Sequence, residues 1–295
     1  MLSILIPIYH FNVIELVKDL HRQASQCNVE FEILCVDDGS DQAFQQENVA
    51  LKEMNQVVYS ELSANIGRSK IRNLLAQKAQ YPYLLFLDCD STTVDTQFIS
   101  RYINHLSKDG LVYGGRCYEK HPPKDARQYF RWWYGVNRET ISARQRVKQP
   151  YHSFMTNNFL IPKSIFNEVQ LDETIKGYGH EDTLFGLELK KRGIAIHHID
   201  NPLCHIGLET FEEYMDKTKE GIRNLKKLMD EQKVDRSVKL YRYYSWVQKI
   251  GVATTIFNYF NKNERLIIEK LKTPEPHLKW FDLYKLGYLI SLTRF

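Results

Sequence analysis

Two aspartates that directly follow an apolar run are the strongest candidates for metal chemistry in the sequence. The run from Tyr83 to Leu87 leads into Asp88, Cys89 and Asp90, and its length predicts a strand buried on both faces. Because a buried strand cannot keep unpaired carboxylates, both aspartates are expected where the strand leaves the sheet. Side chains two residues apart on an extended segment point the same way, so the pair can converge on one hard cation that holds a diphosphate. The alternative is a strand-end turn in which the acids only favour solubility.

Three cations lie at the start of a predicted helix, a place where acids are normally preferred. The helix opens after Gly67, and the cations are Arg68, Lys70 and Arg72. They indicate that an anion binds nearby. The alternative is a solvated basic face.

Two neighbouring acids, Glu181 and Asp182, begin another predicted helix after a glycine-punctuated loop at 177–179. A carboxylate at the start of a helix, facing the edge of the sheet, can deprotonate an acceptor hydroxyl as a general base. The alternative is that both acids only cap the helix and offset its dipole.

Apolar strands that alternate with amphipathic helices predict an α/β fold. The strands are expected at 2–8, 31–36, 57–61, 83–90, 111–115, 153–162 and 194–199. In this order they form a parallel sheet with right-handed crossovers. Asp37 and Asp38, after the second strand, then lie on the same sheet edge as Asp88 and Asp90. Ligands of such sheets bind at the carboxyl ends of the strands.

The pattern becomes helical after residue 208, which predicts an α/β domain at 1–208 and a helical extension at 209–295. One long amphipathic helix is expected at 211–232, and the apolar and aromatic stretches at 246–260 and 280–295 carry interleaved basic residues. Such helices suit a peripheral contact with a membrane; the alternative is a small helical subdomain packed on the first domain. The aromatic segment 127–149 is expected to form a helix packed on the sheet, with a lid or acceptor platform as the alternative.

Composition disfavours several classes of protein. The 295 residues carry a net charge of +4, but residues 216–295 hold 17 Lys and Arg against 9 Asp and Glu, a local +8. The tail is therefore expected to meet something anionic. The basic charge lies away from any recognisable nucleic-acid-binding fold, and no G-x-G-x-x-G follows the first strand, which disfavours an NAD-dependent enzyme. Scattered cysteines, the lack of a signal-peptide pattern and the lack of a run of ~18 to 20 apolar residues predict a cytoplasmic protein, or one at the inner face of the cell membrane.

Four motifs in this order resemble glycosyltransferase family 2, whose fold is GT-A, the nucleotide-diphospho-sugar transferase fold. They are Ser3 to Tyr9, Val36 to Ser40, Asn65 to Asn73 and Leu87 to Asp90, and the resemblance covers residues 1–208. Two later segments, 177–182 and 204–207, look like the branch that contains bacterial chondroitin polymerases and like the C-terminal region of galactosyltransferases.

The resemblance implies a mostly parallel sheet flanked by helices. It also implies inverting transfer of a hexosyl or N-acetylhexosaminyl group from a UDP-sugar to a hydroxyl. The acceptor would be a glycan or a lipid-linked molecule in bacterial surface polysaccharide synthesis.

The same resemblance implies catalytic and metal-binding roles. Asp182 matches the position of the general base, and Glu181 would bind hydroxyls of the acceptor or the donor. Asp90 would be the direct metal ligand, His205 would complete the metal site, and Asp88 would reach the ribose or a metal-bound water. A carboxylate and imidazole set suits manganese better than calcium, so the cofactor is expected to be Mn²⁺ or Mg²⁺. For His205, a buried structural histidine is the alternative.

The resemblance further implies a nucleotide pocket. Asp38 would bind the uracil base, Arg72 would lie against the base or the diphosphate, and Pro7 and Tyr9 would line the pocket. Two alternatives stay open. One is a nucleotidyltransferase of similar fold, although the glycine- and arginine-rich phosphate loop of that class is absent from the N-terminal region. The other is a non-catalytic relative that binds a sugar nucleotide or a membrane, and the intact acidic residues argue against it.

Overall fold

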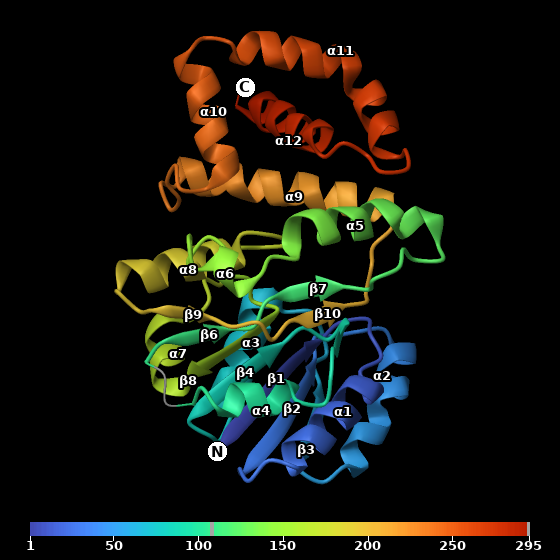
Figure 1. The fold of residues 1–295 in the computed structure, drawn as a ribbon, viewed down its shortest axis with the longest axis vertical. Helices are drawn as coiled ribbons and strands as arrows, with labels where there is room; N and C mark the ends of the chain where they lie inside the picture. The colour runs from blue at the N-terminus through green and yellow to red at the C-terminus, as the bar shows by residue number, and fades with distance from the viewer. Residues whose placement is uncertain (107–108, 294–295) are drawn as a thin grey trace. The chain divides into compact units, whose positions relative to one another are not determined.

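The computed structural model describes residues 1–106 and 109–293 and divides the chain into two compact units (Figure 1). The sheet unit comprises Met1–Glu119, Thr140–Thr174 and Glu181–Gly207. The helical unit comprises Lys120–Glu139, Ile175–His180 and Leu208–Phe295. Two short inserts, 120–139 and 175–180, therefore pack with the C-terminal helices and not with the sheet that surrounds them in the sequence.

A seven-stranded, mostly parallel sheet forms the centre of the sheet unit, and the predicted α/β fold is confirmed. The strand order is β3-β2-β1-β4-β8-β6-β9. Only β8 runs antiparallel to its neighbours β4 and β6; the other pairs are parallel. The strands are β1 (Leu2–Ile8), β2 (Phe31–Asp37), β3 (Val57–Glu61), β4 (Tyr83–Leu87), β6 (Leu111–Tyr113), β8 (Asn158–Pro162) and β9 (Ile196–His198).

Helices cover both faces of this sheet, which explains why its central strands are apolar throughout. In β1, Ile4 and Ile6 pack into a core with α1 (Ile14–Ser25) and α4 (Phe98–Ile103). Leu5, which points the other way, packs into a second core with α3 (Arg68–Lys78), α7 (Lys163–Val169) and α8 (Glu181–Lys191). Short helices α2 (Gln42–Asn48) and η1 (Val49–Glu53) connect β2 to β3, and α6 (Ala143–Arg146) precedes β8.

A second, three-stranded sheet lies in the same unit and was not predicted. Its order is β5 (Ser91–Thr93), β10 (Leu203–His205) and β7 (Arg116–Tyr118). The register pairs His205 with Ser91 on one side and with Tyr118 on the other. This pairing brings His205 beside the residue that precedes Ser91, which is Asp90.

The helical unit contains four long helices and one aromatic insert. The helices are α9 (Phe211–Asp230), α10 (Lys239–Lys249), α11 (Ala253–Leu271) and α12 (Lys279–Leu292), and residues 294–295 of the predicted last stretch lie outside the described residues. Thr210 and Glu213 cap α9 reciprocally in a capping box. The predicted stretch 246–260 is divided between α10 and α11 at Gly251, whose φ of 77° ends the first helix.

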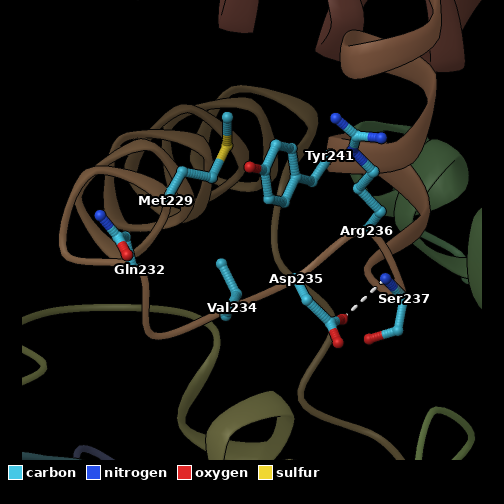
Figure 2. Close-up of a pocket in the computed structure, with 7 residues that line it drawn as sticks. All are labelled: Met229, Gln232, Val234, Asp235, Arg236, Ser237 and Tyr241. Atoms are coloured by element: carbon cyan, nitrogen blue, oxygen red, sulfur yellow. Dashed lines mark hydrogen bonds between the residues drawn. The ribbon is translucent and has the colours of Figure 1, made fainter.

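The turn between α9 and α10 lines an open pocket of about 660 Å³ (Figure 2). Met229 of α9 and Tyr241 of α10 both line it, and the backbone N–H of Ser237 donates a hydrogen bond of 2.8 Å to the carboxylate of Asp235. This bond stabilises the turn and so fixes the start of α10. No helix in the described ranges is long and apolar enough to cross a bilayer.

The expectation that the aromatic segment 127–149 packs on the sheet is wrong for its first part. The segment forms η2 (Ala126–Gln128), α5 (Tyr129–Tyr134) and the π-helical turn η3 (Gly135–Glu139). Phe130 packs edge-on against Phe211 of α9 and Phe281 of α12, with ring centroids 5.2 Å apart in each case. The C-terminal helices carry aromatic residues that pack against this segment. An aromatic run in the sequence predicts burial, but it does not predict the surface on which the residues will pack.

Candidate functional site

The predicted site residues of the sheet unit gather where its parallel strands end. Tyr9, Asp38 and Asp88 directly follow β1, β2 and β4. These strands are neighbours and parallel, so their carboxyl ends share one edge of the sheet. The first turns of α3 and α8 supply the remaining charged groups.

Asp88 is held by two arginines. Nη2 of Arg72 donates to Oδ1 of Asp88 at 2.5 Å, and Arg72 is only 3% exposed. Nη2 of Arg116 lies 3.9 Å from the other carboxylate oxygen of Asp88. The backbone of Asp88 is fixed as well, because its N–H donates to the carbonyl of Asn157 at 3.0 Å. The side chain of Asp88 is therefore held between Arg72 and Arg116.

Asp90 lies directly beside His205. Oδ1 of Asp90 is 3.3 Å from Nδ1 of His205, which is 3% exposed. The carbonyl of Asp90 accepts hydrogen bonds from the N–H groups of Ile206 and Gly207. Burial opposes ionisation of Asp90, but the nearby His205, Arg116 and Arg68 outweigh it and hold the pKa of this carboxyl well below its usual range. Asp90 is thus an anion at neutral pH.

Gly207 is needed for this arrangement. A Cβ placed on Gly207 would lie 2.6 Å from Cβ of Asp90, which is closer than two non-bonded carbon atoms can approach. The backbone at 206–207 therefore lies against Asp90 in a way that permits only glycine.

Asp90 and His205 fit a divalent cation as two of its ligands. Nδ1 of His205 faces Oδ1 of Asp90 at 3.3 Å, and a carboxylate with an imidazole is a donor set that Mn²⁺ accepts. Within residues 1–106 and 109–293 there is no cluster of three or more His, Cys, Asp or Glu side chains suited to a metal. The predicted further ligand Asp88 is engaged by Arg72. The protein would thus provide two ligands and leave the other positions to phosphate oxygens and water.

Glu181 and Asp182 differ in their surroundings although they are adjacent in α8. Nε of Arg68 donates to Oε1 of Glu181 at 2.6 Å. Burial raises the pKa of Glu181, but the charges of Arg68 and Arg72 and the hydrogen bonds to the carboxylate together outweigh it, and the net effect is a lowered pKa. Burial and then the charge of Glu181 raise the pKa of Asp182 to about 6, although the N–H of Thr183 donates to its Oδ1. One acid is a permanent anion, and the other titrates close to neutrality.

Arg68 connects the two ends of the site electrostatically. It forms the ion pair with Glu181, and its charge also lowers the pKa values of Asp182 and Asp90. Such an influence reaches only a short distance in a protein. The acids of α8 and the acids after β4 therefore belong to one constellation.

Asp38 joins two loops at the edge of the sheet. Its carboxylate accepts the backbone N–H groups of Ile66 and Gly67 at 2.7 Å and 3.1 Å, and the residue is 4% exposed. Burial raises the pKa of Asp38, and these two hydrogen bonds offset part of that effect. Each carboxylate oxygen has a second lone pair, so Asp38 can still accept a hydrogen bond from a base.

Pro7 and Tyr9 lie at the end of β1. Pro7 stands opposite Val36 of β2 in the register. The ring of Tyr9 is 49% exposed and stacks on His10 with centroids 4.0 Å apart. An exposed aromatic ring at this edge offers a flat surface to a nucleotide base.

Sequence reasoning missed Arg116. Nη2 of Arg116 lies 3.0 Å from Nδ1 of His205 and 3.9 Å from Oδ2 of Asp88, so this guanidinium lies close to both His205 and Asp88. It follows Gly114 and Gly115 on a strand of three residues, too short to show any periodicity. The one available signal is a lone basic residue between glycines and an apolar segment, which does not indicate a site by itself.

The fold and the acidic sheet edge define the class of GT-A glycosyltransferases, which the comparisons with known proteins support. The model of glycosyl transferase family 2 matches residues 3–170, more than half of the chain. The chain therefore belongs to glycosyl transferase family 2.

One solved structure shares the fold of this chain at low sequence identity. The mannosyltransferase PcManGT from Pyrobaculum calidifontis, solved in complex with GDP-Man and Mn²⁺, is 11% identical with a TM-score of 0.59, and the match covers 98% of this chain and 85% of that one. Residues 1–349 of S. aureus TarS are 15% identical with a TM-score of 0.49, over 99% of this chain and 91% of that one. A search among curated proteins found no match.

Proposed function

We propose that this chain is an inverting, metal-dependent glycosyltransferase that moves a sugar from a UDP-sugar to a hydroxyl of a glycan or lipid-linked acceptor in bacterial surface polysaccharide synthesis. The observation that carries the proposal is the difference between Asp182 and the anions around it. Asp182 has a pKa raised to about 6, whereas Glu181 and Asp90 have lowered pKa values. A general base works best with a pKa near the working pH, so Asp182 is the acid suited to proton transfer.

In this mechanism Asp182 removes the proton from the acceptor hydroxyl. The acceptor oxygen then forms a bond to the anomeric carbon from the side opposite the diphosphate, and the bond to the diphosphate oxygen breaks with its electron pair. A single displacement of this kind inverts the anomeric configuration. Glu181, which accepts a hydrogen bond from Arg68, would also accept hydrogen bonds from sugar hydroxyls.

The leaving diphosphate needs positive charge as the bond breaks. Arg68, Arg72 and Arg116 provide it within the sheet unit, and Arg72 and Arg116 are themselves oriented by Asp88. A divalent cation held by Asp90 and His205 would neutralise further charge on the diphosphate. In this proposal residues 1–208 form the catalytic domain and 209–295 a helical extension.

The nucleoside would lie at the ends of β1 and β2. Asp38 would accept a hydrogen bond from the uracil base, and Pro7 and Tyr9 would line the pocket. The mannosyltransferase of similar fold was solved with GDP-Man, which makes a guanine nucleotide the natural competitor in any test of donor choice.

Titration calorimetry of the whole chain tests the proposal. UDP, GDP and CDP are titrated in Mn²⁺ and again after addition of EDTA. We expect UDP to bind more tightly than the other two, and we expect EDTA to weaken its binding. Tight binding of GDP in place of UDP would mean that the donor is a GDP-sugar. Nucleotide binding of equal strength in Mn²⁺ and in EDTA would mean that no metal takes part in binding.

Turnover decides between the enzyme and a non-catalytic relative. Incubation with UDP-sugars and Mn²⁺ should release UDP slowly to water even without the natural acceptor, and Asp182→Asn should stop that release. A chain that binds UDP but never releases it from any UDP-sugar would be the non-catalytic relative.

A further inference from the structure

One face of α10 is both apolar and cationic. Apart from Gln248, its exposed residues recur every three or four positions, which places them on a single face of the helix. They are Lys239, Arg242, Tyr243, Trp246 and Lys249, and Ile250 follows in the same stripe. Trp246 is 56% exposed, the largest value among the exposed large apolar residues of the described chain.

Another side of α10 packs into the helical unit. Val247 is 2% exposed and packs with Ile290 of α12 and Ala253 of α11, and Tyr244 packs against the same cluster. Since α10 is anchored by this face, its exposed aromatic residues are not required for the core of the helical unit. Exposing a tryptophan to water is unfavourable, so the stripe requires another explanation.

A second stripe of the same kind lies on α11. Tyr259 and Leu266 are 44% and 45% exposed, and the exposed Lys262 lies between them on the same face. Phe260 and Ile267, on the other face of α11, are buried in the core of the helical unit. Two helices of the unit thus combine one buried apolar face with one exposed face that is aromatic, aliphatic and basic.

The charge of the stripe indicates its partner. Helix α10 contains three cations and no Asp or Glu, and within the described residues neither Arg242 nor Lys249 takes part in an ion pair. A second copy of the chain related by a two-fold axis would bring these cations against the same cations. An anionic partner, in contrast, would be attracted along the whole helix.

We propose that the exposed face of α10 docks on the surface of an anionic lipid bilayer. Tyr243, Trp246 and Ile250 would enter the headgroup region, where amphipathic aromatic rings are favoured. Arg242 and Lys249 would remain at the level of the lipid phosphates, and basic side chains near such a surface strengthen binding. This goes beyond the proposed reaction, and it needs neither the nucleotide nor the metal.

Sedimentation of the full chain with lipid vesicles tests the proposal. Vesicles of equal parts phosphatidylglycerol and phosphatidylcholine are compared with vesicles of phosphatidylcholine alone. We expect binding to the first and little to the second, with a loss of binding at high salt. No binding to the anionic vesicles at low salt would overturn the proposal.

Two sets of substitutions separate the apolar and the charged contributions. The triple variant Tyr243→Ser, Trp246→Ser, Ile250→Ser should weaken vesicle binding by at least about tenfold, because it removes the three apolar groups that would enter the headgroup region. Arg242→Gln with Lys249→Gln should weaken it by about fivefold for each cation removed. A triple variant that sediments like the unmodified protein would overturn the proposal.

The control variant replaces exposed apolar residues that lie outside the helical unit. Val49 and Val58 in the sheet unit are 49% and 53% exposed, so Val49→Ser with Val58→Ser removes exposed apolar groups outside α10 and should leave vesicle binding unchanged. Circular dichroism checks that every variant is folded. Analytical ultracentrifugation completes the test, because a dimer that Trp246→Ser dissociates would assign this face to a second copy and overturn the lipid proposal.

Discussion

Arg68 and Glu181 form an ion pair that joins the first turn of α3 to the first turn of α8. Nε of Arg68 donates to Oε1 of Glu181 at 2.6 Å, and the side chain of Glu181 is 7% exposed. Both helices begin here, so their positive dipole ends share this corner of the sheet unit. The pair fixes the backbone on which Asp182 is held.

Asp182→Asn is the sharpest test of the proposed base. The amide keeps the shape of the carboxylate but cannot take a proton at neutral pH. We expect the rate of sugar transfer to fall by a factor of about 10² to 10⁴, while the affinity for UDP measured by calorimetry stays the same. Transfer within a few-fold of the original rate would show that another group is the base.

Glu188→Gln is the matched control on the same helix. Glu188 pairs with Arg192 at the partly exposed side of α8, and it lies two turns beyond Asp182. This variant should transfer sugar at the original rate. If both variants lose a similar share of the transfer rate, the substitutions disturb α8 as a whole, and the loss in Asp182→Asn does not identify the base.

The rate of transfer should depend on pH through Asp182. Its pKa is raised to about 6, so the base is protonated and inactive below that value and ionised above it. We expect kcat to rise about tenfold per pH unit below pH 6 and to level off above pH 7. A rate that is flat between pH 5 and pH 7 would contradict this assignment.

Two neighbouring substitutions should move this pH profile in opposite directions. Glu181→Gln removes a charge that raises the pKa of Asp182, so the profile should shift to lower pH. Arg68→Gln removes a cation that lowers it, so the profile should shift to higher pH. A structural loss alone would reduce the rate in both variants without these opposite shifts.

The sheet was largely predictable because its strands are buried on both faces. Ile4, Leu5 and Ile6 meet helices on one side or the other, so the sequence shows an unbroken apolar run. The small sheet of β5, β7 and β10 could not be predicted in this way. Its strands have three residues each, and its pairing joins segments that are far apart in the chain.

The site residues also differ in how well the sequence predicts their position. Asp88 and Asp90 follow a strong strand signal, and the structure places them at the sheet edge as expected. The structure brings His205 to Asp90 through the pairing of β10 with β5, a contact that no local pattern contains. Arg116 was missed for the same reason, and the insert at 120–139 gave no sign that it packs with the C-terminal helices.

Removal of either proposed metal ligand should make nucleotide binding insensitive to the metal. Asp90→Ala and His205→Gln each take one ligand from the pair. In calorimetry we expect UDP to bind weakly to both variants, with the same affinity in Mn²⁺ and in EDTA. Binding that still strengthens in Mn²⁺ would exclude that residue as a ligand.

Gly207→Ala tests the close contact beneath Asp90. The added methyl group would lie 2.6 Å from Cβ of Asp90, so Asp90 or the backbone must move. Because metal ligands tolerate only small displacements, we expect UDP binding to lose its response to Mn²⁺ while the protein stays folded.

Gly221→Ala is the control for this substitution. Gly221 lies inside α9, where the added methyl group would have only an ordinary contact of 3.8 Å with the carbonyl of Tyr178. Alanine favours a helix over glycine by about 1 kcal/mol, so this variant should be at least as stable as the original. Its UDP binding should still respond to Mn²⁺.

Arg131→Met should destabilise the helical unit strongly. Arg131 is 2% exposed, its Nη2 and Nε lie 3.2 Å and 3.0 Å from carboxylate oxygens of Glu139 and Glu209, and its guanidinium lies over the ring of Tyr214. The methionine would leave two half-buried carboxylates beside an apolar side chain. Loss of one partner of a buried ion pair costs about 3 to 5 kcal/mol, and we expect the free energy of unfolding to fall by that amount.

Urea unfolding followed by tryptophan fluorescence measures this change in the helical unit itself. All four tryptophans of the chain, at 132, 133, 246 and 280, lie in that unit, so the signal does not report on the sheet. Arg265→Gln, which breaks an exposed pair with Glu269 one turn along α11, should leave the urea midpoint nearly unchanged because exposed pairs contribute little. If Arg131→Met unfolds at the same urea concentration as Arg265→Gln, the buried pair does not stabilise the packing of α5 on α9.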